Sequence, residues 1–329
     1  MAFALMCFIP GRAQKVNTGK TVSKPLYDDP VYHGAADPVI IYNKQKKKWW
    51  MFYTNRRASL DDSTGVAWVH GTRIGIAEST DGREWEYVDT VSINYRPDSG
   101  YTFWAPDVIE HNGLYHMYLT YVPGVFENWN HPRYIIHVTS TDLFNWKYES
   151  KLNLVNEKVI DASVFPLPGG TWRLWYNNEK DGKSIWYADS KDLYTWEDKG
   201  KAIAARGEGP KTFRWQGKYF MIVDAWKGME VYSSEDLLKW TRQSMRILEE
   251  PGKGIDDQAI GGHCDIVVND DKAYVFYFTH PGRRKDKPAA RNSFEDKRSV
   301  IQLVELHYVN GEITCDRNEP VIIELKPGK

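Results

Sequence analysis

The chain has 329 residues with 43 Lys and Arg against 44 Asp and Glu, which gives a formal net charge of −1. It therefore lacks the excess of basic residues that is typical of nucleic-acid-binding proteins. Apolar residues make up 42% and charged residues 26% of the chain, which is typical of a soluble globular protein and excludes wholesale disorder. No apolar run approaches the ~20 residues that cross a bilayer, so we expect no membrane span.

The first 13 residues resemble the end of a secretory signal peptide. Residues 2–9 are apolar, and small residues precede a cleavage position after Ala13. Although the basic region that begins such signals is missing, we interpret residues 1–13 as a signal-peptide remnant and expect a periplasmic or secreted protein. A short apolar strand packed on the domain and a lipoprotein anchor at Cys7 are the alternatives.

Strand-like segments dominate the rest of the chain, because they are rich in aromatic and β-branched residues and turn residues lie before most of them. No stretch shows a long helical periodicity. The sequence therefore predicts an all-β protein, with strands that include residues 50–53, 114–121, 172–176, 219–224 and 273–278.

A Ser-x-Asp-x-x-x-Trp motif occurs four times, and its Trp residues are 44 to 61 positions apart. Strand-rich repeats of about this length are typical of β-propellers, in which each repeat is one four-stranded blade. We expect the Ser and Asp to bind the backbone of a tight turn between outer strands, and the Trp to pack between blades. The four copies are residues 79–85, 140–146, 190–196 and 234–240.

A second repeat sets the number of blades, because a short segment that suits an innermost strand precedes each aromatic strand pair. There are five, at residues 36–40, 105–109, 160–164, 207–210 and 262–266. We therefore predict a five-bladed β-propeller as a single domain of residues 14–329, with the active site at one end of the central axis. The fifth blade lacks the Ser-Asp-Trp turn and is expected to take its outer strand from one terminus.

Two stretches interrupt this period. Residues 55–73 form an insertion in the first blade, which we expect to wall one side of a pocket and to favour action on chain ends. Residues 283–298 are strongly basic and are interpreted as a solvated loop, with a basic lip that faces the substrate as the alternative.

Equivalent positions on the inner strands converge on one mouth of a propeller, and here most of them are acidic. Crowded carboxylates raise one another's pKa and are rarely brought together without function. Paired carboxylates suit glycoside hydrolysis, in which one stays protonated and the other is ionised; a separation of ~6.5–9.5 Å admits the water of an inverting reaction. The aligned residues are Asp37, Asp107, Asp161, Glu208 and His263.

From about residue 37 to residue 280 the chain resembles glycoside hydrolase family 43. The resemblance rests on Asp37-Pro38, the Trp-Ala-Pro at residues 104–106, Asp161, the Glu-Gly-Pro at residues 208–210 and His263, one per blade and in order. It implies Asp37 as the general base, Glu208 as the general acid, and Asp161 as the residue that orients the acid and raises its pKa. It also implies a calcium ion in the central channel, with His263 binding a water or the metal, while no cofactor is required for the reaction.

Four further residues are candidates for substrate binding: His70, Trp104, Trp226 and Arg283. Trp104 suits either a stacking platform or inter-blade packing, Trp226 follows a strand of the fourth blade, and Arg283 suits either sugar binding or an exposed loop. Residues 68–78 are also similar to glycoside hydrolase family 117, which implies action on α-linked anhydrogalactose ends and a His acid, here His70 or His263.

We therefore expect an exo-acting, inverting glycosidase that removes a terminal arabinofuranosyl, galactofuranosyl or xylosyl group from plant or algal oligosaccharides or polysaccharides, with no obligate protein partner. Three alternatives stay open. They are a family-117-like anhydrogalactosidase, a propeller that binds glycans without cleaving them, and a phosphorylase, which would need a phosphate pocket near Arg56 and Arg57.

Overall fold

The computed structural model describes residues 20–61, 64–95 and 100–327, and the expected signal-peptide remnant lies outside these ranges. The described chain is almost entirely β-structure, as predicted. Its helical segments are one four-residue α-helix, α1 (Phe294–Lys297), and a 3-10 turn at Ala67–Val69. No helix in these ranges has the length and apolarity to cross a membrane.

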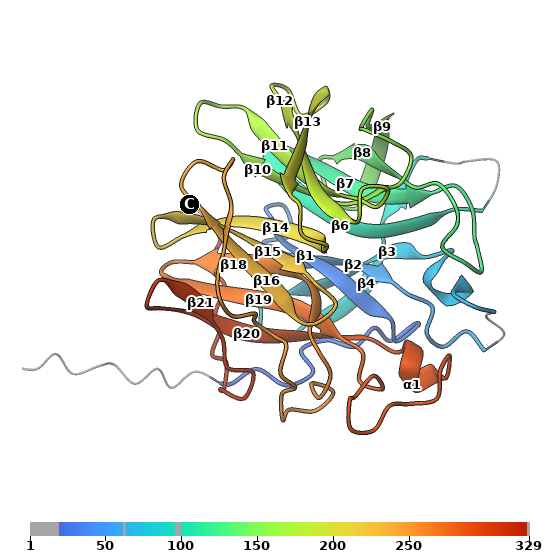
Figure 1. Ribbon diagram of the computed structural model, residues 1–329. Coiled ribbons are helices and arrows are strands. Elements are labelled where there is room, and N and C mark those ends of the chain that lie inside the picture. Colours follow the sequence, from blue (N-terminus) through green and yellow to red (C-terminus); the bar gives the residue numbers. More distant parts are fainter. Residues whose placement is uncertain (1–19, 62–63, 96–99, 328–329) are drawn as a thin grey trace, which may run out of the picture.

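Five antiparallel sheets surround a central axis, which confirms the five-bladed propeller (Figure 1). The innermost strands β1, β6, β10, β14 and β18 contact one another in ring order, and β18 returns to β1. Blade one contains β1 (Ala35–Asn43), β2 (Lys48–Asn55), β3 (Arg73–Ser79) and β4 (Glu86–Thr90). Blade two contains β6 (Thr102–His111), β7 (Leu114–Val122), β8 (Tyr134–Ser140) and β9 (Asn145–Lys151), with the short β5 (Ser92–Ile93) beside β9.

The other three blades follow the same order from the axis outward. Blade three contains β10 (Val159–Pro166), β11 (Trp172–Asn178), β12 (Ser184–Ser190) and β13 (Trp196–Ile203). Blade four contains β14 (Glu208–Trp215), β15 (Lys218–Asp224), β16 (Met229–Ser234) and β17 (Thr241–Arg242). Blade five contains β18 (Gly262–Asn269), β19 (Lys272–Thr279), β20 (Val300–Val309) and β21 (Glu312–Thr314).

The Ser-Asp-Trp motif closes the outer turn of blades one to four, as predicted. In blade two, Ser140 Oγ accepts hydrogen bonds from the backbone N–H of Asp142 and Leu143, and Trp146 Nε1 donates to the Leu143 carbonyl at 2.9 Å. The Leu143 position has φ of 66°, and in blade one the glycine at position 82 takes this left-handed conformation. The motif Trp residues then pack in the apolar cores between blades.

Each pair of neighbouring blades shares one apolar core, so the ring is held by five such cores rather than by one. The ring closes between blades five and one. There Val321, Ile323 and Leu325 join the shared core, and the Leu325 N–H donates to the Asp81 carbonyl at 2.7 Å. The outer strand of blade five, β21, comes from the C-terminal end of the chain, as expected.

All five inner strands carry an irregularity at the same level. The pairing register of β1, β6, β10, β14 and β18 with the next strand shifts near the start of each inner strand. In the first four blades a residue within this bulge has positive φ, and two of these residues are Asp37 (51°) and Asp161 (58°). A β-bulge re-aims side chains, and these bulges turn the acidic groups toward the mouth of the axis.

Candidate active site

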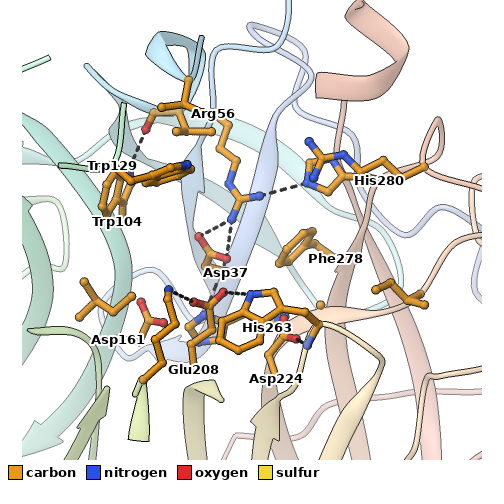
Figure 2. Close-up of a pocket in the computed structure, with 18 of the residues that line it drawn as sticks. Asp37, Arg56, Trp104, Trp129, Asp161, Glu208, Asp224, His263, Phe278 and His280 are labelled. Atoms are coloured by element: carbon orange, nitrogen blue, oxygen red, sulfur yellow. Dashed lines mark hydrogen bonds and ion pairs between the residues drawn. The ribbon is translucent and has the colours of Figure 1, made fainter. Parts of the chain in front are cut away.

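A pocket of about 1060 Å³ lies at this end of the axis, and the bulged ends of the inner strands form its floor. Figure 2 shows the acidic groups of different blades pointing toward one another, with aromatic side chains above them. The three predicted catalytic residues, Asp37, Asp161 and Glu208, all line the pocket. The arrangement of one carboxyl group per blade therefore exists as expected for blades one, three and four.

Asp37 is paired with an arginine from its own blade. Arg56 Nη2 lies 3.0 and 3.2 Å from the two carboxylate oxygens of Asp37. The Arg56 guanidinium also lies 4.7 Å from the centre of the Phe278 ring, and its Nη1 donates to His280 Nε2 at 3.2 Å. His280 accepts there because its Nδ1–H donates to the Arg298 carbonyl. This chain fixes Arg56, which keeps a positive charge against the Asp37 carboxylate.

Glu208 is set at the start of β14 with a donor and a cation beside it. Trp226 Nε1 donates to Glu208 Oε1 at 2.9 Å, and Lys183 Nζ lies 3.8 Å from Oε2. Burial raises the pKa of Glu208, and Lys183 partly offsets this increase. A carboxylic acid with a raised pKa keeps its proton near neutral pH, which a general acid requires.

Two more buried carboxyl groups surround Glu208. Burial and repulsion from Glu208 raise the pKa of Asp161 well above its ordinary value, and they raise the pKa of Asp224 to about 7. Asp161 Oδ2 accepts the Gly209 N–H at 3.1 Å, so it fixes the backbone directly after the acid. Asp224 accepts hydrogen bonds from the backbone N–H groups of Trp226 (2.7 Å) and His263 (2.8 Å). The three carboxyl groups are therefore coupled, and protonation of one favours ionisation of the others.

His263 faces the base rather than an open coordination site. Its Nδ1 lies 3.7 Å from Asp37 Oδ1, and burial lowers its pKa, so it is neutral near pH 7. Its ring also lies against Gly209, where a Cβ atom would come within 2.6 Å of His263 Cγ. Gly209 has φ of 56°, so both the backbone conformation and the close approach require glycine.

We expect Gly209→Ala to displace Glu208 and to lower kcat as well as the melting temperature. Gly217→Ala is the matched control, because Gly217 lies in the next turn of the same blade with φ of 77° and no neighbour within 4 Å. The control carries the backbone strain of about 1–2 kcal/mol without the clash. Equal kcat values for the two variants would contradict this account of Gly209.

Asp107 does not lie with the other acids, and the predicted alignment of this residue is wrong. In blade two the bulge contains Ala105 and Pro106, so Asp107 lies beyond it and deeper in the channel. There Lys211 Nζ lies 2.6 Å from Asp107 Oδ1 and 2.9 Å from Asp265 Oδ1. This residue is excluded from the pocket floor because the bulge shifts the register.

The central channel does not fit the calcium ion that the resemblance implies. Between the carboxylates of Asp107 and Asp265 stands the ammonium group of Lys211, whose pKa these carboxylates keep high. Within the described ranges no group of three or more His, Cys, Asp or Glu is arranged to hold a metal.

Aromatic side chains form one wall of the pocket. Trp104 lines it and is held by a hydrogen bond from its Nε1 to the Val69 carbonyl, so it both packs between elements and contacts the cavity. Trp129, with 52% of its surface exposed, lies 6.0 Å from Trp104 between ring centres. Trp68 comes from the blade-one insertion and completes the wall, which confirms that this insertion borders the pocket.

His70 is not a substrate-contacting residue, which corrects the sequence-based prediction. It is fully buried behind Trp104, with its Nδ1 bonded to the Val66 carbonyl and its Nε2 2.9 Å from His131 Nε2. Its ring packs 5.1 Å from the Trp104 ring. His70 therefore supports the wall from behind.

Trp226 and Arg283 both line the pocket, as predicted, but each is partly engaged within the protein. The Trp226 ring lies under the Lys183 ammonium at 5.1 Å and the Arg206 guanidinium at 4.7 Å. Arg283 Nε lies 3.2 Å from Asp296 Oδ1. Residues 283–298 are not simply a solvated loop, because Arg283, Arg291, Asn292 and Asp296 face the cavity.

Comparison with known proteins agrees with this geometry. The model of the family described as "Glycosyl hydrolases family 43" matches residues 27–292. The chain belongs to this family. A thermostable family-43 glycoside hydrolase is 19% identical with a TM-score of 0.65, and the match covers 92% of this chain and 98% of that one. The GH43_1 enzyme from Xanthomonas citri complexed with xylotriose is 14% identical, with a TM-score of 0.66 and coverage of 92% and 96%.

A fructan beta-fructosidase from Streptococcus mutans is 26% identical over an alignment of 167 positions that covers 43% of this chain. The match spans only 11% of the length of that fructosidase.

The sequence assigns no role, or another role, to several residues of this family-43 pocket. Arg56 and Arg57 are candidates for a phosphate pocket by sequence, but Arg56 is paired with Asp37, and Arg57 Nη2 donates to the Ala67 carbonyl. Lys183 carries no motif, and Trp129 lies in a loop without a repeat. Asp224 ends a predicted strand, and only the blade geometry shows that this end reaches Glu208.

Proposed function

We propose that the protein is an exo-acting, inverting glycoside hydrolase with Asp37 as general base and Glu208 as general acid. The observation that carries this proposal is the contrast between the two groups. The Asp37 carboxyl group is paired with the Arg56 guanidinium, whereas burial raises the pKa of Glu208. One carboxyl group paired with a cation and one with a raised pKa suit the base and the acid of glycoside hydrolysis.

In the proposed reaction, Asp37 accepts a proton from the water that attacks the anomeric carbon. Glu208 donates its proton to the departing glycosidic oxygen, and Trp226 Nε1–H keeps the acid oriented. Asp161 Oδ2 accepts the Gly209 N–H and so fixes the backbone directly after the acid. Trp226 and Asp161 are therefore positioning groups around the acid.

The blade-one insertion supports action on chain ends, since Trp68 and Val69 close one side of the cavity. Trp104 and Trp129 offer the aromatic faces on which a sugar stacks. Solved neighbours include a β-xylosidase and a β-1,3-galactosidase, so xylosides and galactosides join arabinofuranosides as the first substrates to test. Plant or algal glycans, and a periplasmic or secreted location, belong to the same proposal.

A histidine acid is less well supported. His70 is buried behind the wall, and His263 is neutral beside the base rather than near a leaving group.

Hydrolysis of aryl glycosides and oligosaccharides, with NMR of the first anomer released, tests the proposal. A retained anomer would contradict inversion, and glycan binding without cleavage would favour a binding propeller.

We expect Lys183→Met to extend activity to higher pH. Lys183 lowers the pKa of Glu208, so its removal raises that pKa. Activity needs protonated Glu208 and falls as pH rises through this pKa, so the alkaline limb of kcat/KM moves upward. Lys180→Met, which removes an exposed cation paired with Glu157, is the control. An alkaline limb that stays in place would argue against Glu208 as the titrating acid.

A further inference from the structure

We propose that the substrate carries an anionic group, a carboxylate or a sulfate ester, next to the sugar that is removed. This inference rests on the proposed function and specifies its substrate class. Around the pocket, the cations and the carboxylates are not equally matched within the protein.

Each acidic group of the pocket either has a cation partner within the protein or is driven by burial toward its protonated form. Asp37 is paired with Arg56, Glu179 with Arg133 at 2.5 Å and with Lys183 at 2.8 Å, and Asp296 with Arg283. The remaining three are Asp161, Glu208 and Asp224, which burial drives toward the protonated form.

Several cations at the mouth have no carboxylate partner among the described residues. Lys158, Arg206 and Arg291 line the pocket. A smaller hollow shares Trp226, Ile260 and Arg283 with the pocket and therefore continues it outward; its wall adds Lys227 and Lys285. The one acid of that hollow, Glu249, lies 3.4 Å from Arg246. The excess of positive charge is local, since the whole chain has a formal net charge of −1.

Arg206 is arranged to bind an anion. Its guanidinium lies over the Trp226 ring at 4.7 Å, which restrains the planar group while its N–H donors remain available at the rim. A restrained guanidinium suits the two oxygens of a carboxylate or sulfate group. A cleft lined by one sign of charge also raises the local concentration of oppositely charged ligands.

The position of these cations places the anion outside the catalytic floor. Arg206, Arg291, Lys227 and Lys285 are exposed, whereas Asp37 and Asp161 are buried at the bottom. The terminal sugar therefore occupies the floor, and the anionic group belongs to the part of the glycan that extends toward the mouth.

The test compares matched oligosaccharides with and without their charge. Native and carboxyl-reduced pectic oligosaccharides form one pair, and native and desulfated algal galactan oligosaccharides form the other. We expect the wild type to prefer the charged member of one pair, with a kcat/KM that falls as salt is added. Preference within the first pair identifies a carboxylate, and preference within the second a sulfate.

Arg206→Gln and Arg291→Gln are each expected to raise KM for the charged member about two- to fivefold, the effect of one exposed ion pair, and the double variant about tenfold. Lys287→Gln is the matched control, an exposed cation of the same loop that does not line the pocket. Neutral aryl glycosides should be cleaved equally well by the wild type and all four variants.

Equal kcat/KM for charged and neutral members of both pairs would overturn the inference while leaving the hydrolase intact. Loss of activity toward neutral aryl glycosides in Arg206→Gln would also overturn it, because Arg206 would then act on the catalytic groups. If no substrate is cleaved, the proposed function fails. Calorimetric titration of the same pairs then still decides whether the mouth binds an anion.

Discussion

Glu208→Gln is expected to lower kcat by about 10²- to 10⁴-fold on a natural glycosidic linkage, the contribution of a positioned general acid. Gln keeps the size of the side chain and an oxygen that accepts the Trp226 Nε1 hydrogen bond. The variant should therefore fold and bind substrate, but it has no proton to give to the leaving oxygen. Steady-state kinetics on an oligosaccharide and on aryl glycosides measure the effect.

The leaving group separates loss of the acid from general damage. The dinitrophenolate of a dinitrophenyl glycoside departs as an anion without protonation, so Glu208→Gln should lose much less activity on this substrate than on an oligosaccharide. Asp37→Asn is the comparison, because removal of the base slows the attack of water on both substrates. If Glu208→Gln lost the same factor on both, the role of Glu208 as acid would be wrong.

The repeat motifs predict most of the fold, because propeller blades are specified locally. Each Ser-Asp-Trp turn is closed by its own side chains, as with Ser140 and Trp146. The inner strands can also be predicted from the sequence, since five short segments precede five aromatic strand pairs. Blade number and the blade that carries each acid therefore follow from the sequence alone.

The depth of each acid along the axis does not follow from the sequence. A shift of two residues relative to the bulge separates Asp107, in the channel, from Asp37 and Asp161, at the floor. Motif analysis also does not predict that Arg56 pairs with Asp37 or that Lys183 lies beside Glu208, because these roles depend on contacts with other strands. His70 shows the reverse error, since a polar residue in a promising motif is buried behind Trp104.

The deeper level holds a charge cluster that connects all five blades. Lys211 of blade four bridges Asp107 of blade two and Asp265 of blade five. Asp107 Oδ2 accepts the Val164 N–H of blade three, and Asp265 Oδ2 accepts the Ile40 N–H of blade one, both at 2.7 Å. One ammonium group thus holds two carboxylates that each fix a neighbouring inner strand.

Lys211→Met should therefore destabilise the protein by about 3–5 kcal/mol, the effect of breaking a buried ion pair. This corresponds to a fall in melting temperature on the order of 10 °C. The two carboxylates that remain would repel each other. Burial already raises the pKa of Asp265, and loss of the cation raises it further, so the deficit should shrink as pH falls and the acids become protonated.

The triple variant Asp107→Asn, Lys211→Met, Asp265→Asn tests this explanation. The Asn oxygens still accept the Val164 and Ile40 N–H groups, while the repulsion is gone, so stability should recover in part. In the wild type, EDTA and calcium should leave the melting temperature unchanged, because the ammonium group already balances the carboxylates. A triple variant as unstable as Lys211→Met would show that the packing of the lysine stem, rather than its charge, holds the centre of the ring.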